Sequence, residues 1–211
     1  MRDGLRALLE HQPGMEIVGE ASTGYEVLEL AQTLLPDVVV MDVSMPELNG
    51  AEATRRLLAK SSSVKVVALS VHTDRQYVMA MFDAGAVAYL PKNAAFDELA
   101  LAIGAVMQGQ RYLSPAVTAV VIDGYLRGAG AAPTPLSTLS AREREVLQLL
   151  AEGHSSKDIA AKLNVAVATV ETHRRQIATK LDIHSVAELT KYAIREGLTS
   201  LDDRRTPGTG R

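Results

Sequence analysis

Short apolar runs alternate with longer amphipathic segments over the first 110 residues of the chain. The apolar runs are β-branched and nearly continuous, which is typical of buried strands in a parallel sheet. They are EIVGEA (16–21), DVVVMD (37–42), VKVVAL (64–69) and AVAYLP (86–91). The segments with apolar residues at helical spacing are 23–34, 50–60, 74–84, 95–108 and 115–126, and a first helix is expected in MRDGLRALLEHQPG. This strand–helix alternation predicts a doubly wound α/β domain with right-handed crossovers.

The pattern becomes purely helical after a small, Gly/Pro-rich segment, RGAGAAPTPLST (127–138), which predicts a flexible tether. Ser140 with Glu143, and Ser155 with Asp158, have the spacing of capping boxes at helix starts. We therefore expect an α/β domain followed by an all-α domain. The predicted parts are 1–112 (α/β domain), 113–136 (linker helix and tether), 137–198 (helical domain) and 199–211 (a disordered tail).

Charge is distributed unevenly between the two halves. Residues 1–122 hold 9 Lys/Arg against 14 Asp/Glu, whereas residues 137–197 hold 9 against 8. The acidic first half is a poor candidate for contact with DNA, and the excess of positive charge between Lys162 and Lys180 could follow a phosphate backbone. The chain contains no cysteine and no apolar run approaching the about 20 residues of a membrane helix, so a cytoplasmic protein without membrane contact is expected.

The string LSAREREVLQLLAEGHSSKDIAAKLNVAVATVETHRRQIATKL (139–181) resembles the LuxR-type helix-turn-helix almost end to end. Asn164 stands at the corner between two helices, where a left-handed residue is needed. The resemblance implies that 166–181 is the recognition helix in the major groove of double-stranded DNA. The residues expected to face base edges are Glu171, Thr172 and Arg175, and those expected to face phosphates are Thr169, Arg174 and Lys180.

Several positions in this region carry further expectations. Glu171 could accept a hydrogen bond from cytosine or hold Arg175. Ala166 and Ala168 replace the family's usual serine cap and lysine, which should weaken DNA binding by a monomer. His173 and Ile177 are expected to pack inward. In the last helix, 185–198, the family pattern implies a dimer contact at Val186, Leu189 and Thr190.

The first half resembles a receiver domain, so the whole chain resembles a NarL/FixJ-type two-component response regulator with a flavodoxin-like fold. DVVVMDVSMPELNG (37–50) places the phosphoacceptor at Asp42. The resemblance also implies that Ser70 binds a phosphoryl oxygen, that Lys92 neutralises it, and that Tyr89 turns inward on activation. Ligands of open parallel sheets bind at the carboxyl ends of the strands, where these residues would converge.

The receiver's first strand, which ends in the acidic pair that holds Mg²⁺, does not occur in this sequence. Asp3 lies on the predicted first helix and does not replace it. The remaining ligands would be the Asp42 carboxylate and the Ser44 backbone carbonyl, so Mg²⁺ binding should be weak or absent. In the family's strand order 2-1-3-4-5 the missing strand is central. We therefore expect an N-terminally truncated receiver, with either an earlier natural start or a rearranged sheet.

These features predict a non-enzymatic transcription regulator that a histidine kinase phosphorylates on Asp42 and that binds DNA as a homodimer. One alternative is a regulator that works without phosphorylation because its receiver is degenerate. A second is a phosphatase with an aspartate nucleophile, which the sequence disfavours because Ser44 stands where such enzymes place their second aspartate.

Overall fold

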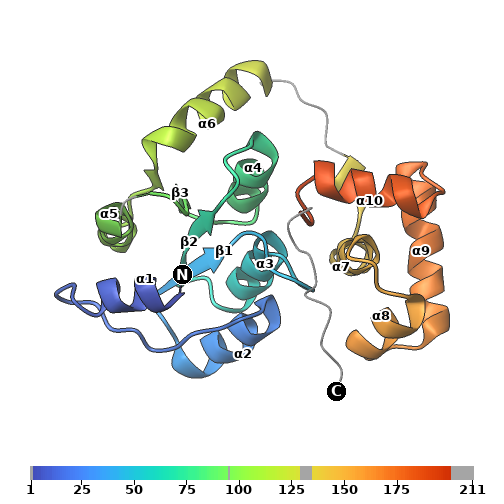
Figure 1. Cartoon of the computed structure of the whole chain (residues 1–211), viewed down its shortest axis with the longest axis horizontal. Coiled ribbons are helices and arrows are strands. Elements are labelled where there is room, and N and C mark those ends of the chain that lie inside the picture. Colours follow the sequence, from blue (N-terminus) through green and yellow to red (C-terminus); the bar gives the residue numbers. More distant parts are fainter. Residues whose placement is uncertain (1, 95, 129–134, 201–211) are drawn as a thin grey trace. The chain divides into compact units, whose positions relative to one another are not determined.

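The computed structural model describes residues 2–94, 96–128 and 135–200. Apart from the short segment Pro46–Leu48, the chain divides into one compact unit that runs to Ala129 and a second that begins at Gly130. The first unit is an α/β domain and the second is helical (Figure 1).

The first unit contains a parallel sheet with the strand order β1-β2-β3-β4. Its strands are β1 (Val38–Asp42), β2 (Lys65–Ser70), β3 (Ala88–Pro91) and β4 (Tyr112–Leu113). Its helices are α1 (Arg2–Leu9), α2 (Gly24–Leu34), α3 (Gly50–Lys60), α4 (Arg75–Asp83), α5 (Phe96–Met107) and α6 (Pro115–Gly128). Helix α5 covers one face of the sheet, and α3 and α4 lie on the other (Figure 1). This is the doubly wound architecture that the sequence predicts.

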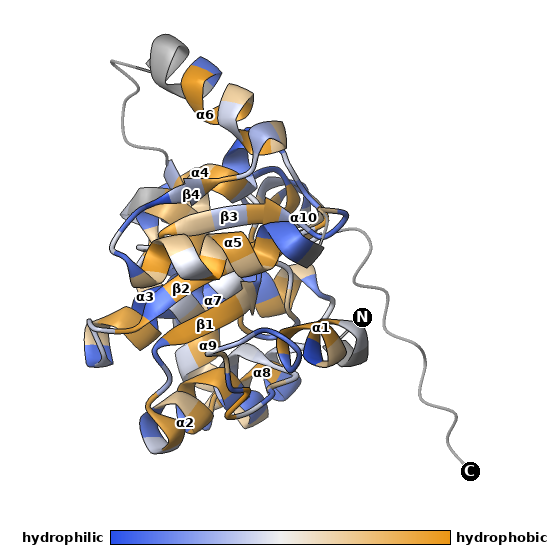
Figure 2. Ribbon diagram, turned by 90° about the vertical axis from the view of Figure 1, so that its left-hand side faces the viewer, coloured by the Kyte–Doolittle hydropathy of each residue, from blue (hydrophilic) through white to orange (hydrophobic). Residues whose placement is uncertain are grey.

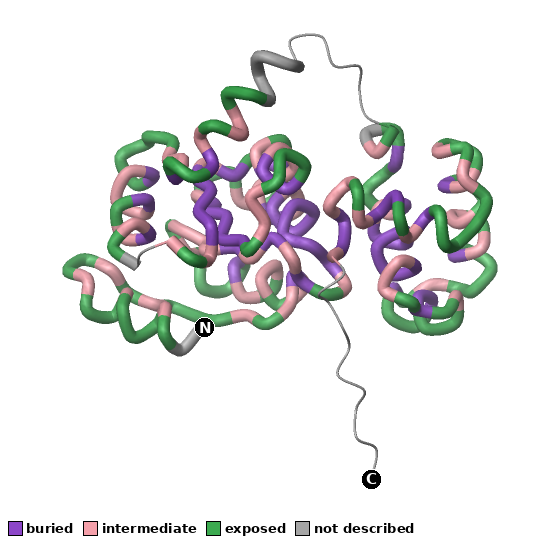
Figure 3. Tube along the Cα trace, turned by 45° about the horizontal axis from the view of Figure 1, so that its top comes forward, coloured by how far each residue is buried: buried purple, intermediate pink, exposed green. Residues whose placement is uncertain are grey.

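The core of the first unit follows the alternation of side chains along the strands. Val67, Leu69 and Leu90 point to one face, where they pack against Leu99 and Val106 of α5. Strands β1 and β3 are largely hydrophobic (Figure 2). Strands β2 and β3 are buried at nearly every position, and buried residues gather in the interior of the unit (Figure 3). Because both faces of the sheet are covered, the strands are apolar at nearly every position.

The predicted strands at 37–42, 64–69 and 86–91 are confirmed, but the one at 16–21 is wrong. Residues 15–21 belong to no sheet, and Val18 is exposed. In the family's order, the neighbour of this strand is the first receiver strand, which the described residues do not contain. An isolated strand has no ladder partners, so it has no means to form. The two-residue strand β4 was not predicted, because two residues are too few to show the alternation of apolar and polar side chains.

A close backbone contact joins the end of β1 to the start of α3. A Cβ added to Gly50 would lie 2.2 Å from the carbonyl oxygen of Asp42 and 2.9 Å from the Cα of Val43. The Gly50 amide also donates to the Val43 carbonyl at 2.9 Å, and the Asn49 side chain caps the helix. Only glycine fits here, so α3 is held directly against the segment that carries Asp42.

The second unit is a small bundle around one hydrophobic core. Its elements are η1 (Pro135–Thr138), α7 (Ala141–Ala151), α8 (Ser156–Lys162), α9 (Val167–Leu181) and α10 (Val186–Arg195). Both predicted capping boxes are present. Asn164 has the expected left-handed conformation with a φ of 50°, and the N-cap residue Ala166 makes no side-chain bond.

The predicted tether and tail need correction at their ends. Helix α6 extends to Gly128, and residues 135–138 form a 3₁₀-helix, so only the middle of the predicted tether is left, and 129–134 lie outside the described residues. The predicted tail begins too early, because Thr199 is buried. Most of that tail, 201–211, also lies outside the described residues.

A buried carboxylate links the first turn of α7 to the last turn of α9. The Glu143 side chain accepts from the Ser140 amide at 2.7 Å and from Lys180 Nζ, on the last turn of α9, at 2.6 Å. Burial alone raises the pKa of Glu143, but the hydrogen bonds from Lys180 and Ser140 outweigh it and leave this pKa below the ordinary value of 4.5. Lys180 therefore stabilises the bundle.

Gly50→Ala should lower the stability of the first unit by about 2–3 kcal/mol, because the added methyl meets backbone atoms that cannot move aside cheaply. Gly104→Ala is the matched control, since this glycine lies inside α5 with open space around its Cβ position. That variant should gain about 0.5–1 kcal/mol. Hydrogen exchange of the β2 amides measures both effects, and unchanged exchange in Gly50→Ala would contradict the contact.

Lys180→Ala should destabilise the second unit by about 1–3 kcal/mol at neutral pH, because Glu143 then stays buried without its cation. A carboxyl with a lowered folded pKa stabilises the fold above its unfolded pKa, and this contribution disappears as the pH falls through the folded value. The difference between wild type and variant should therefore shrink below pH 4.5. Urea unfolding at several pH values tests this, with Lys191→Ala, at an exposed lysine of α10, as the control.

Candidate functional site

Three predicted site residues meet at the carboxyl edge of the sheet. Asp42 ends β1, Ser70 ends β2 and Lys92 follows β3. The ladder pairs Asp42 with Leu69 and Ser70 with Pro91, so the three strand ends are level. Lys92 Nζ donates to Asp42 Oδ2 at 2.5 Å. The structure therefore brings the Asp42 and Lys92 side chains into contact and places Ser70 at the neighbouring strand end.

The Asp42 carboxylate is held at both oxygens and is still accessible. Its Oδ1 accepts a hydrogen bond from the Ser44 amide at 3.2 Å, while Oδ2 binds Lys92. The Asp42 side chain is 35% exposed and that of Lys92 is 20% exposed. A carboxylate that is oriented, paired with a cation and open to solvent can act as a nucleophile toward an electrophile delivered from outside.

Ser70 and Tyr89 form the buried floor beneath this edge. Ser70 Oγ accepts from the His72 amide at 3.0 Å, and the Tyr89 hydroxyl donates to the His72 carbonyl at 2.7 Å. Tyr89 is fully buried and therefore points inward in this structure. Burial is the main cause that raises the pKa of Tyr89 to about 12, so its hydroxyl remains a donor at neutral pH. Both side chains thus hold the loop that follows β2.

The donor set at this edge does not fit a divalent cation well. Mg²⁺ demands near-octahedral oxygen coordination and is usually held by one or two carboxylates together with waters and phosphate oxygens. Asp42 supplies one carboxylate, and one of its oxygens already binds Lys92. Among the described residues no group of three His, Asp or Glu side chains could hold a metal ion. The predicted ligand Ser44 directs its amide toward Asp42.

The predicted DNA-contacting face lies on α9, which follows α8 and the left-handed residue Asn164. Thr169, Thr172 and Arg175 are exposed on this helix. The Thr172 hydroxyl donates to the Ala168 carbonyl at 2.9 Å. Ile177 is buried, as expected, whereas His173 is only half-buried. The helix therefore presents a polar surface opposite its packed side.

Glu171 has partners that the sequence interpretation did not foresee. Its Oε1 accepts from the Ser156 hydroxyl at 2.5 Å and from Arg174 at 3.1 Å. The bond from Ser156 is the main cause that lowers the pKa of Glu171. Of the two interpretations of Glu171, the hydrogen bond to Arg175 is not formed, because the bonded arginine is Arg174, three residues on. The interpretation that Glu171 accepts from cytosine stays a prediction. Ser156 was missed, since no sequence spacing links it to a residue in the next helix.

Two further predicted site residues are corrected by their surroundings. Lys180 was expected to face phosphates, but it pairs with the buried Glu143. Leu189 was expected at a dimer contact, but it is 4% exposed and belongs to the core of the helical unit. The neighbouring Val186 is 45% exposed, and Thr190 is half-buried. Only these two remain on the surface that a partner could reach.

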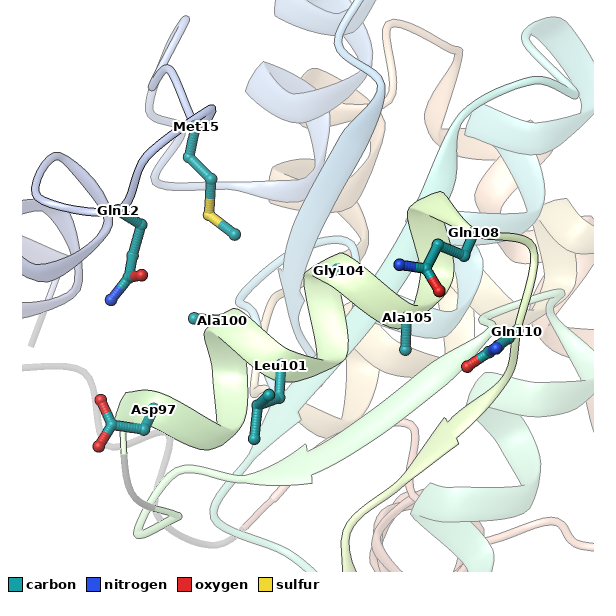
Figure 4. A pocket seen from close by; sticks show the side chains of 9 residues that line it. All are labelled: Gln12, Met15, Asp97, Ala100, Leu101, Gly104, Ala105, Gln108 and Gln110. Atoms are coloured by element: carbon teal, nitrogen blue, oxygen red, sulfur yellow. The ribbon is translucent and has the colours of Figure 1, made fainter.

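A shallow hollow of about 560 Å³ lies elsewhere on the first unit. Gln12 and Met15 face α5 across it, and Asp97, Leu101 and Gly104 line its other side (Figure 4). Asp97 is the one charged side chain among its lining residues. The hollow is lined by none of the residues at the carboxyl edge, so we assign it no role.

No helix within the described ranges is both long enough and apolar enough to cross a bilayer.

Two family models match the chain and divide it between them. Residues 1–104 match the response regulator receiver domain. Residues 137–193 match the bacterial regulatory proteins of the luxR family. The first match covers the first unit from α1 to most of α5, including Asp42, and the second covers α7 to α9 and most of α10.

Relatives of similar length match across both units. The response regulator UvrY of Escherichia coli K12 is 36% identical over 202 residues, which are 96% of this chain and 92% of that protein. The transcriptional regulatory protein LiaR of Bacillus subtilis is 38% identical over 200 residues, 95% and 94% of the two chains.

Two solved structures support the same fold. A LuxR-family two-component response regulator from Aurantimonas sp. is 32% identical, with a TM-score of 0.57 over 59% of this chain and 89% of that one. RcsB of Salmonella enterica serovar Typhimurium, in a structure bound to a promoter, has a TM-score of 0.58 over 94% and 93% of the chains, and its 22% identity shows the fold alone. The chain therefore belongs to the transcriptional response regulators of two-component systems that join a receiver domain to a LuxR-family helix-turn-helix domain.

Proposed function

We propose that Asp42 accepts a phosphoryl group from a histidine kinase and that this modification controls binding of the helical unit to double-stranded DNA. The observation that carries this proposal is the Asp42–Lys92 pair at the carboxyl edge, where an accessible carboxylate lies 2.5 Å from a lysine ammonium. Family membership supplies the donor class, because receiver domains take phosphoryl groups from histidine kinases.

In the proposed reaction an Asp42 carboxylate oxygen attacks the phosphorus of a phosphohistidine. An O–P bond forms at Asp42 while the P–N bond breaks, and the imidazole leaves with the electron pair. Lys92 is placed to neutralise charge on the transferred group, and the buried Ser70 hydroxyl can donate to one of its oxygens. A Ser70 hydroxyl that turned to the phosphoryl group would still accept the His72 amide bond.

The link to DNA binding rests on α9 and α10. Thr169 and Arg175 provide exposed donors on α9 that suit base edges and phosphates. The exposed Thr172 hydroxyl donates its proton to the Ala168 carbonyl and can still accept a hydrogen bond. Solved structures of RcsB hold that protein as dimers bound to DNA. By analogy, we propose that this chain binds DNA as a homodimer through the exposed Val186 and the half-buried Thr190 of α10.

A second candidate function is a regulator that binds DNA without phosphorylation. The poor fit of the Asp42 site to Mg²⁺ favours it, because phosphoryl transfer depends strongly on charge neutralisation. In this case Lys92 would hold Asp42 permanently in the ion pair.

Incubation of the full chain with acetyl phosphate, with and without Mg²⁺, should add the mass of one phosphoryl group at Asp42. Asp42→Asn should abolish the gain because it removes the nucleophile, whereas Asp74→Asn, at an exposed carboxylate after β2, should retain it. Intact-mass spectrometry measures the result. An unmodified wild-type protein under both conditions would favour the phosphorylation-independent regulator.

Arg175→Ala should weaken binding to a preferred DNA sequence by about 1–3 kcal/mol and relax the preference at one base position. An exposed arginine can contact guanine through two hydrogen bonds that alanine cannot replace. Binding to a pool of sequence variants measures both effects, with Lys191→Ala on α10 as the control. Equal losses on preferred and random DNA would show that Arg175 contacts the backbone instead.

A further inference from the structure

A serine at the start of α8 reaches across to two residues of α9. The Ser156 hydroxyl donates to Glu171 Oε1 at 2.5 Å and accepts from Arg174 NH1 at 3.0 Å. Arg174 NH1 also donates to the same Glu171 oxygen at 3.1 Å. These three residues, the Ser156 cluster, form a closed ring of hydrogen bonds between α8 and α9, the helix that is proposed to contact DNA.

The cluster compensates the negative charge of Glu171 on that helix. A carboxylate on a DNA-binding surface repels phosphates unless a cation and hydrogen-bond donors satisfy it. The Glu171 side chain, 39% exposed, receives both from Arg174 and Ser156. Its lowered pKa, caused first by the bond from Ser156, keeps it ionised at neutral pH, so the cluster persists there.

The same ring orients the Arg174 guanidinium. A guanidinium carries five N–H donors, and the bonds to Ser156 and Glu171 use only NH1. Within the described part of the chain no other side-chain hydrogen bond of Arg174 is found, and the side chain is 32% exposed. Fixing one end of an arginine before binding removes part of the entropic cost of ordering it on the DNA.

The Ser156 hydroxyl is not needed to start its own helix. The neighbouring Ser155 is the N-cap of α8, where its hydroxyl accepts the Asp158 amide at 3.2 Å. Asp158 in turn accepts the Ser155 amide, so this capping box is complete without Ser156. The bonds that Ser156 makes with its side chain are directed to α9.

We propose that Ser156 is a positioning residue for DNA recognition, which fixes Glu171 against Arg174 and directs the remaining Arg174 donors toward DNA. This inference rests on the proposed function, because it requires that α9 contacts DNA. Ser156 itself acts through Arg174 and need not touch the DNA.

The test uses the full chain and a DNA duplex that the wild-type chain selects from a random pool. Ser156→Ala should weaken binding to this duplex about three- to tenfold, as expected when one hydrogen bond that only positions a DNA contact is lost. Because Ser156 also fixes Glu171, which is expected to face base edges, binding to unrelated DNA should change less and the selectivity should fall. Ser156→Thr, which keeps the hydroxyl, should restore most of the selectivity.

Ser155→Ala is the matched control, because it removes the helix cap and leaves the Ser156 cluster. It should lower the melting temperature while selectivity stays close to that of the wild type. A double-mutant cycle supplies the final measurement: Ser156→Ala should cost little further affinity once Arg174→Ala is present.

The outcomes separate the two proposals. If the wild-type chain selects no duplex, the proposed DNA-binding function fails and the inference fails with it. If the wild type binds and Ser156→Ala keeps full selectivity, DNA binding stands and the positioning role is refuted. The same conclusion follows if the loss of affinity in Ser156→Ala adds fully to the loss in Arg174→Ala.

Discussion

The hydrogen-bond ladder of the parallel sheet sets the position of everything at the receiver edge. It aligns the ends of β1, β2 and β3, so that Asp42 and Lys92, which are 50 positions apart in the sequence, reach the same edge. The Asp42–Lys92 ion pair is a result of this register. Gly50 then fixes α3 against the same edge, because its missing side chain lets two backbone segments touch. The positions of Asp42 and Lys92 therefore depend more on the packing of the backbone than on contacts between polar side chains.

This dependence explains what could be predicted in the first unit. Buried strands such as β2 are apolar at nearly every position, and their order follows from the alternation with helices, so the convergence of Asp42, Ser70 and Lys92 could be foreseen. The segment 16–21 also contains β-branched apolar residues but forms no strand, since pairing depends on a neighbour and not on the segment alone. The pattern of apolar residues indicates which side chains a strand could bury, but it does not indicate whether a neighbouring strand is there to pair with it.

The second unit shows the same limit at the level of side chains. Its capping boxes were predicted because their partners are three residues apart and their geometry is local. The bond between Lys180 and Glu143 spans 37 residues, and that between Ser156 and Glu171 spans 15. Both depend on how helices pack, so the sequence could not distinguish Lys180 in a structural role from Lys180 as a phosphate contact. Leu189 was misjudged for the same reason, because the register of α10 against the core was unknown.

Because of the Lys180–Glu143 bond, substitutions are more constrained at the end of α9 than at its start. The last turn is tied to the cap of α7, so a substitution there also affects folding of the whole bundle. The first turns carry exposed residues such as Thr169 and Thr172, which have few packing duties. New operator preferences could therefore arise by exchange of residues in the first half of the helix, while the second half preserves the scaffold that presents them.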